Sequence, residues 1–172
     1  MTFSLLFTFS VVFILASIMI GMTFYHYSSI KLMVGMMIAM VLGMSVGLTV
    51  GVILGILYVE NLFLSTILSM VIGIVAGFLA GIPSGFMGVL DGTLSGIMGG
   101  MMGAMLGAMI TPEFQDPIIR IMVLLFVAII IILYQMLQQE FFKRKGLMTN
   151  PVFLLLIYVL FILGYNQIGP LL

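Results

Sequence analysis

Methionine is the residue whose number and spacing in this sequence most directly indicate chemistry. The chain contains 18 methionines in 172 residues, and ten of them lie in two segments, MVGMMIAMVLGM at 33–44 and MGGMMGAMLGAM at 98–109. Both segments follow the pattern Met-x-x-Met-Met-x-x-Met-x-x-x-Met. Side chains three and four residues apart lie on one face of a helix, so each segment predicts a ladder of thioethers. The ladders consist of Met33, Met37, Met40 and Met44, and of Met98, Met102, Met105 and Met109.

Thioether sulfur is a soft ligand, and soft ligands select Cu(I), and the chemically similar Ag(I), over hard cations such as Mg²⁺. We therefore predict the ladder methionines as candidate ligands for Cu(I). Met44 and Met98 are expected at a similar depth, roughly 20 Å from the inner ends of their helices, so that the two ladders join into one path. The alternative is a packing role, because methionine is flexible and fills irregular gaps between helices.

Asp91 is the one acidic residue well inside an apolar segment. A carboxyl group at membrane depth is costly and usually faces a protein interior or a water-filled cavity, which makes it a functional candidate. We predict Asp91 as a gate, or as a site for a proton or a cation, with Thr93 and Ser95 nearby. The alternative is a protonated, hydrogen-bonded aspartic acid that holds neighbouring helices together.

The composition places these residues on helices within a membrane. Hydrophobic residues make up 64% of the chain and charged residues only 6%, whereas a soluble domain has about 25% charged residues. A spanning helix needs about 20 mostly apolar residues. We predict an all-α integral membrane protein with a single transmembrane domain over residues 1–172 and about six transmembrane helices. The spans are expected near residues 3–24, 30–58, 62–82, 85–110, 117–138 and 151–169.

Glycine is expected to hold the second, third and fourth spans together. Small residues recur every four positions there, and such stripes let helices approach closely in lipid, where van der Waals contact supplies the attraction. These three Gly-rich spans are therefore predicted to pack at the centre of the fold. The packing glycines are Gly35, Gly43, Gly47, Gly51 and Gly55 in the second span, Gly73, Gly77 and Gly81 in the third, and Gly88, Gly92, Gly96 and Gly100 in the fourth.

The positions of the basic residues and of one proline indicate the topology. Pro83 predicts a tight hairpin between the third and fourth spans, because proline would break a continuing helix. Lys and Arg collect in short cytoplasmic loops, and here four of the five occur at Lys31 and at 143–145. The exception is Arg120, which follows Asp116 by four residues, a spacing that lets the two side chains pair on a helix. These loops and the hairpin are predicted inside and both termini outside, in the cytoplasmic membrane of a bacterium.

Several classes of function are not expected from this sequence. Five Lys and Arg residues balance five Asp and Glu residues, so there is no basic tract for nucleic acid. The chain has no cysteine, which excludes disulfides, thiolate metal sites and a cysteine nucleophile. No nucleotide-binding, serine-hydrolase or zinc motif is present, and we predict that the protein is not an enzyme.

The spacing of Met36, Met40 and Met44, together with Gly43 and Gly47, resembles elements in the membrane part of eukaryotic copper importers of the Ctr class. The resemblance covers a few dozen residues at most and implies a shared chemical solution, the handling of Cu(I) by thioethers. This chain departs from that family in having about six predicted spans rather than three. It also places its methionine and glycine patterns on the same helix.

These observations predict a small transporter or metal-handling factor for Cu(I), surrounded by the lipid bilayer and without another cofactor. One alternative is a structural accessory or assembly subunit whose glycine faces pack in a homo-oligomer or a larger membrane complex. A second alternative is an ion or small-solute channel that uses Asp91.

Overall fold

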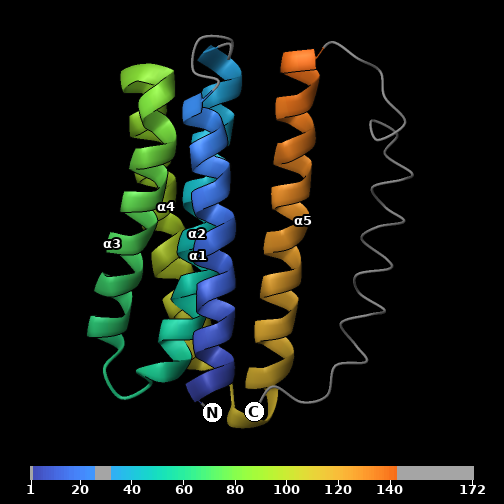
Figure 1. Ribbon diagram of the computed structural model, residues 1–172. Coiled ribbons are helices and arrows are strands. Elements are labelled where there is room, and N and C mark those ends of the chain that lie inside the picture. The colour runs from blue at the N-terminus through green and yellow to red at the C-terminus, as the bar shows by residue number, and fades with distance from the viewer. Residues whose placement is uncertain (1, 26–31, 143–172) are drawn as a thin grey trace.

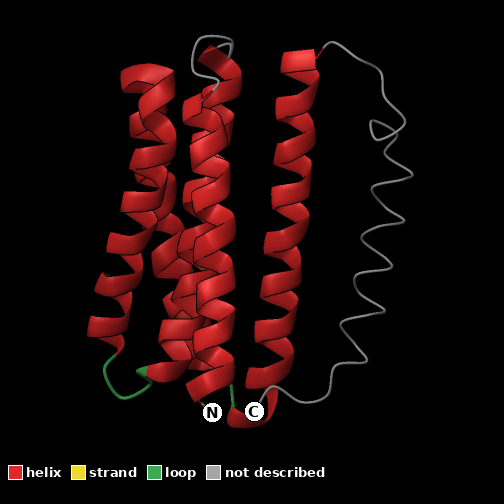
Figure 2. Cartoon of the chain, in the orientation of Figure 1, coloured by secondary structure: helices red, strands yellow, loops and turns green. Residues whose placement is uncertain are grey.

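A computed structural model describes residues 2–25 and 32–142, and every regular element within them is helical (Figures 1 and 2). The five α-helices are α1 (Thr2–Tyr25), α2 (Leu32–Leu57), α3 (Leu62–Gly81), α4 (Gly85–Met109) and α5 (Gln115–Phe142). Short 3-10 turns, η2 (Ile82–Ser84) and η3 (Pro112–Phe114), precede α4 and α5. The helices extend close to the ranges expected for the first five spans. The last expected span, 151–169, lies outside the described residues.

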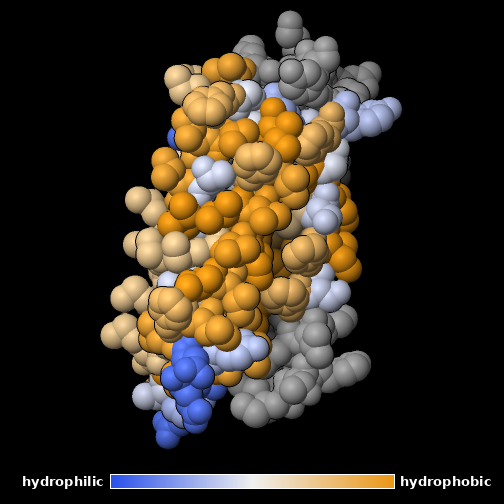
Figure 3. Space-filling model, turned by 90° about the vertical axis from the view of Figure 1, so that its left-hand side faces the viewer, coloured by the Kyte–Doolittle hydropathy of each residue, from blue (hydrophilic) through white to orange (hydrophobic). Residues whose placement is uncertain are grey.

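The described helices have the apolar character that a membrane requires. Three stretches are long and apolar enough to cross one: Leu32–Leu57, Leu62–Met109 and Pro112–Leu137. Leu62–Met109 contains both α3 and α4, which η2 folds back on each other. The surface in Figure 3 is hydrophobic over most of its height, with its most hydrophilic patch at one end. The described part of the chain is thus all-helical, with helices suited to span a membrane as its composition predicts, while the number of six spans stays a prediction.

Helix α2 is the central element of the described part of the chain. It contacts α1, α3, α4 and α5, and its most extensive contact is with α4. Helices α2 and α4 run in the same direction, whereas α3 runs in the opposite direction (Figure 1). Helix α5 stands at the edge of the group and contacts mainly α2.

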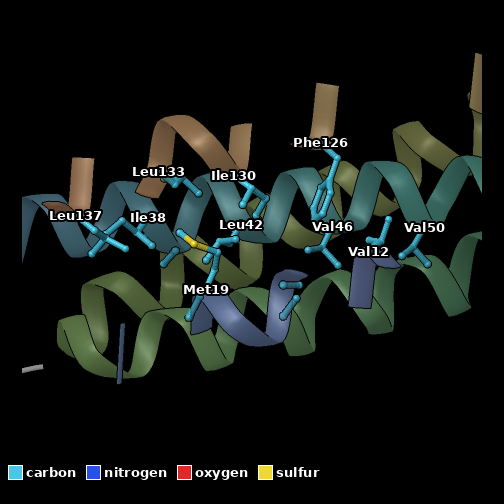
Figure 4. Packing of buried hydrophobic residues seen from close by; sticks show 14 residues of the cluster. Val12, Met19, Ile38, Leu42, Val46, Val50, Phe126, Ile130, Leu133 and Leu137 are labelled. Atoms are coloured by element: carbon cyan, nitrogen blue, oxygen red, sulfur yellow. The ribbon is translucent and has the colours of Figure 1, made fainter. Parts of the chain in front are cut away.

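A cluster of buried hydrophobic side chains joins α2 to α1 and α5 (Figure 4). Ile38, Leu42 and Val46 of α2 meet Met19 of α1 and Phe126 of α5 in this cluster. Ile38, Leu42 and Val46 are branched, and they lie on a different side of α2 from Gly43, Gly47, Gly51 and Gly55. Two kinds of packing therefore meet on α2, one between bulky side chains and one between backbones.

The turn between α3 and α4 depends on residues that cannot continue a regular helix. Pro83 lies in η2, and Gly85 has φ 74° and ψ −166°. This backbone conformation is essentially restricted to glycine, because a Cβ atom would clash with the backbone. The hairpin expected at Pro83 is present, and it brings Gly81 against Gly88.

Candidate functional site

Helices α3 and α4 meet through their backbones. Three glycine pairs face each other along this contact: Gly81 with Gly88, Gly77 with Gly92, and Gly73 with Gly96. A Cβ atom added at Gly81 would lie 2.5 Å from the carbonyl oxygen of Gly88, whereas ordinary van der Waals contact begins at 3.4 Å. Any larger residue at these positions would push the helices apart.

Helices α2 and α4 meet in the same way but run parallel, and we call this contact the seam. Four glycine pairs form the seam: Gly43 with Gly92, Gly47 with Gly100, Gly51 with Gly103, and Gly55 with Gly107. A Cβ atom added at Gly47 would lie 2.8 Å from the backbone nitrogen of Gly100. The seam is closed by backbone atoms, which leave no room for a side chain between α2 and α4 at these glycines. Gly35, near the start of α2, is also buried.

Asp91 belongs to the row of α4 residues that faces α2. Residues four apart follow one side of a helix, and two members of this row contact α2. Gly99 contacts the backbone of Met44, and the hydroxyl oxygen of Ser95 lies 2.9 Å from the position of a Cβ at Gly43. Asp91 comes one turn before Ser95 in the same row. It therefore lies on the α2 side of α4, near the level of Gly43.

Met98 lies on the side of the seam that faces away from α3. Successive residues are rotated by about 100° around a helix axis. Gly99 faces α2, and the next residue, Gly100, faces Ser69 of α3. Met98, one residue before Gly99, is rotated the opposite way, and its side chain is 62% exposed.

The same reasoning places Met44 and Met40 on this side of the seam. Gly43 contacts both α3 and α4, and Leu42, one residue before, is fully buried against the core cluster. Met44, one residue after Gly43, is rotated away from that core. Met44 and Met40 both line a groove of about 220 Å³ between α2 and α5.

Helix α5 contributes the other wall of this groove, which the sequence did not indicate. Met122, Leu125 and Phe126 face Met40 and Met44 across it. Met122 stands alone in a run of aliphatic residues, outside both methionine patterns, so no spacing linked it to the ladders. Its position follows only from the contact of α5 with α2.

Four residues thus border one side of the seam, and we call them the mid-seam cluster: Met40, Met44, Asp91 and Met98. Asp91 and Met98 are seven residues apart on α4, about 10 Å along the helix axis. The contact of Met44 with Gly99 shows that Met44 and Met98 lie at the same level, as expected from the sequence. The four residues supply three thioethers, which are soft ligands, and one carboxyl group.

The polar neighbours of Asp91 in the sequence do not bind its carboxyl group. The hydroxyl of Thr93 donates to the carbonyl oxygen of Leu90 at 3.0 Å, and that of Ser95 donates to Gly92 at 2.9 Å. Among residues 2–25 and 32–142, no hydrogen bond or ion pair holds Asp91. The alternative of a hydrogen-bonded Asp91 that locks these helices together therefore has no counterpart in this part of the chain.

The remaining ladder methionines lie on outward surfaces of α2 and α4. Their exposed fractions are 76% for Met33, 52% for Met37, 61% for Met102, 53% for Met105 and 80% for Met109. These five methionines therefore do not fill gaps between the described helices. Glycine occupies the interfaces so tightly that a long side chain has no room there.

Hard-ligand metal sites are not found in the described ranges, 2–25 and 32–142, where no three His, Cys, Asp or Glu side chains come together. The described helices thus form a bundle suited to a membrane, with methionines on the outward surfaces of α2 and α4. Comparison with protein families, curated proteins and solved structures finds no match for the chain.

Proposed function

We propose that this protein binds Cu(I) within the membrane and passes it along the methionine faces of α2 and α4, with the mid-seam cluster as the central site. The observation that carries this proposal is that Met44 and Met98, one from each ladder, lie at the same level on one side of the seam, the side on which Asp91 also lies. Two patterns that are 65 residues apart in sequence, from Met33 to Met98, converge there. Convergence of soft ligands from separate helices is what a site for a soft ion requires.

The charge of the cluster supports a monovalent ion. Thioethers are neutral, and Asp91 carries one negative charge when it is ionised. One Cu(I) ion would leave the site without net charge, and a charge away from water is tolerated only when it is paired or bound to a metal. A divalent hard cation would find too few oxygen ligands in the cluster.

The remaining methionines of the two ladders extend from the cluster toward opposite ends of the helix bundle. Met33 and Met37 lie toward the start of α2, and Met102, Met105 and Met109 lie toward the end of α4. Because α2 and α4 are parallel, these two ends are on opposite sides. We propose six spans with both termini outside, in a bacterial cytoplasmic membrane, so that the thioethers connect the inner and the outer surface.

Competition with a Cu(I) chelator on the purified protein in detergent tests this function. The triple variant M40L/M44L/M98L is expected to bind Cu(I) at least about tenfold more weakly, which corresponds to 1.4 kcal/mol. Leucine has a similar volume to methionine, so the fold is retained. The matched control is M70L/M101L, because Met70 lies on α3 and Met101 is rotated further from α2 than Gly100. Equal Cu(I) affinity of the wild type and the triple variant would refute the proposal.

A structural accessory subunit is the second candidate, and the closeness of the glycine seams favours it. In that case G47L or G100L would disrupt assembly with a partner complex, while the triple methionine variant would leave both assembly and copper sensitivity of cells unchanged. Co-purification of the wild type with a stable membrane complex is the measurement. A channel around Asp91 finds less support, because the glycine backbones of α2, α3 and α4 are in contact.

A further inference from the structure

Asp91 is an acidic side chain at membrane depth, and no residue of the described ranges, 2–25 and 32–142, binds its carboxyl group. It is half-buried and lies six residues after Gly85, the first residue of α4, which is about 9 Å along the helix. Ionisable groups at this depth usually pair with other groups and mark a functional site. The side chains at the level of Asp91 on the neighbouring helix therefore decide what it can bind.

The packing of α2 against α4 fixes which residues lie at that level. The same difference of 52 in residue number relates three opposed pairs along the seam: Gly43 and Ser95, Gly51 and Gly103, and Gly55 and Gly107. The contact of Gly43 with Gly92 agrees with this register, because it is made by the carbonyl oxygen of Gly92, which projects toward the end of α4. The two helices run in parallel with the same rise, so the register continues toward their starts (Figure 1). It places Asp91 opposite Ala39 and one residue from the level of Met40.

Two thioethers of α2 border the seam near this level. The side of α2 toward α4 is a row of buried small residues that are four apart: Gly35, Ala39, Gly43 and Gly47. Met36 and Met40 each come one residue after a member of this row, as Met44 does, and one residue turns the helix by about 100°. They therefore lie on the same side of the seam as Met44, and Met36 is half-buried there.

Met37 lies elsewhere, although the ladder spacing groups it with Met40. It comes two residues after Gly35 and is thus turned by about 200° from the row that faces α4. Its side chain is 52% exposed. Met36, which is not part of the ladder, is therefore the thioether that borders the seam together with Met40 and Asp91.

We propose that Met36, Met40 and Asp91 form one Cu(I) site beside the seam, near the start of α4; this inference rests on the function proposed above. Along the helix axis, Met40 lies about 1.5 Å and Met36 about 4.5 Å from the level of Asp91. Side chains on a helix lean toward its N-terminus, and because α2 and α4 are parallel, all three lean the same way. Their relative levels are therefore kept at the sulfur and oxygen atoms. Met98, about 10 Å from Asp91 along α4, belongs to the level of Met44 instead.

The three ligands fit Cu(I) in both softness and charge. Two thioethers are soft ligands that select Cu(I), and their flexible side chains adapt to irregular spaces. The thioethers are neutral, so the ionised carboxyl group of Asp91 balances the single positive charge, as a charge away from water requires. Hard divalent cations such as Ca²⁺ take about six to eight oxygen ligands, whereas this site offers one carboxyl group.

Cu(I) affinity in a background without the other cluster methionines tests this site. The variant M44L/M98L keeps the three proposed ligands and is expected to bind Cu(I), measured by competition with a Cu(I) chelator on the purified protein. Adding M36L or D91N should weaken this binding at least about tenfold. Adding M37L is the matched control and should leave the affinity unchanged, because Met37 is next to Met36 in sequence but faces away from α4. Leucine and asparagine nearly keep the volumes of the side chains they replace, and circular dichroism checks that each variant is folded.

X-ray absorption at the copper edge identifies the ligands, and M44L/M98L loaded with Cu(I) should show both sulfur and oxygen neighbours. Equal affinities after M36L and M37L, an unchanged affinity after D91N, or a spectrum with sulfur neighbours alone would overturn this site. Loss of all Cu(I) binding in M44L/M98L, while the wild type binds Cu(I), would also overturn it and leave the proposed function standing. A wild type that binds no Cu(I) would overturn the proposed function, and this site with it.

Discussion

Gly47→Ala is expected to destabilise the protein although alanine is the better helix former. The added Cβ atom would lie 2.8 Å from the backbone nitrogen of Gly100 and 2.8 Å from the carbonyl oxygen of Gly96. Ordinary van der Waals contact begins at 3.4 Å, so α2 and α4 must separate locally by about 0.6 Å. A gap of about 0.5–1 Å between two packed surfaces loses a quarter to a half of the van der Waals energy of each atom pair across it. Overpacking of this kind costs about 1–3 kcal/mol.

Gly21→Ala is the control that isolates this clash. A Cβ atom at Gly21 of α1 meets nothing within 4 Å, and both substitutions gain about 1 kcal/mol in helix propensity. The difference between the two variants should therefore be about 1–3 kcal/mol, the cost of overpacking alone. Unfolding of both variants by a denaturing detergent, followed by circular dichroism, measures this difference. If G47A were as stable as G21A, the inferred closeness of the seam would be refuted.

Two further variants test other features of the fold. Gly85→Ala should destabilise the α3–α4 hairpin by about 1–3 kcal/mol through backbone strain, although its Cβ atom would meet no other residue within 4 Å. The same unfolding assay measures this loss. If Gly85→Ala were as stable as Gly21→Ala, the positive φ of Gly85 would be contradicted. Ser65→Ala should leave stability unchanged or raise it by up to about 1 kcal/mol. The reason is that the Ser65 hydroxyl is buried without a hydrogen-bond partner among the described residues. If detergent unfolding showed a loss of stability of more than about 1 kcal/mol, this hydroxyl would have a partner after all.

The helix boundaries were accessible from the sequence because they coincide with local signals. The α3–α4 turn is an example: Pro83 cannot continue a helix, and the adjacent Gly85 adopts a conformation that other residues avoid. The last span expected at 151–169, and with it the full number of spans, remains a prediction.

The candidate site was only partly accessible. The ladder spacing correctly indicated that Met40 and Met44 share a face of one helix, but spacing along one helix does not say what lies opposite that face. Whether these methionines were buried fillers or outward ligands depended on which residues filled the interfaces. Glycine backbones fill them, so the methionines point outward.

The sequence by itself determined that this protein is helical and belongs in a membrane, because a chain with 6% charged residues cannot build a water-facing surface. It also determined which residues share a helix face, since the period of the α-helix is constant. Only the tertiary structure decided that Asp91, Met98, Met40 and Met44 border the same side of one seam. That arrangement depends on how α4 is rotated and aligned against α2, which is set by contacts between segments far apart in the chain.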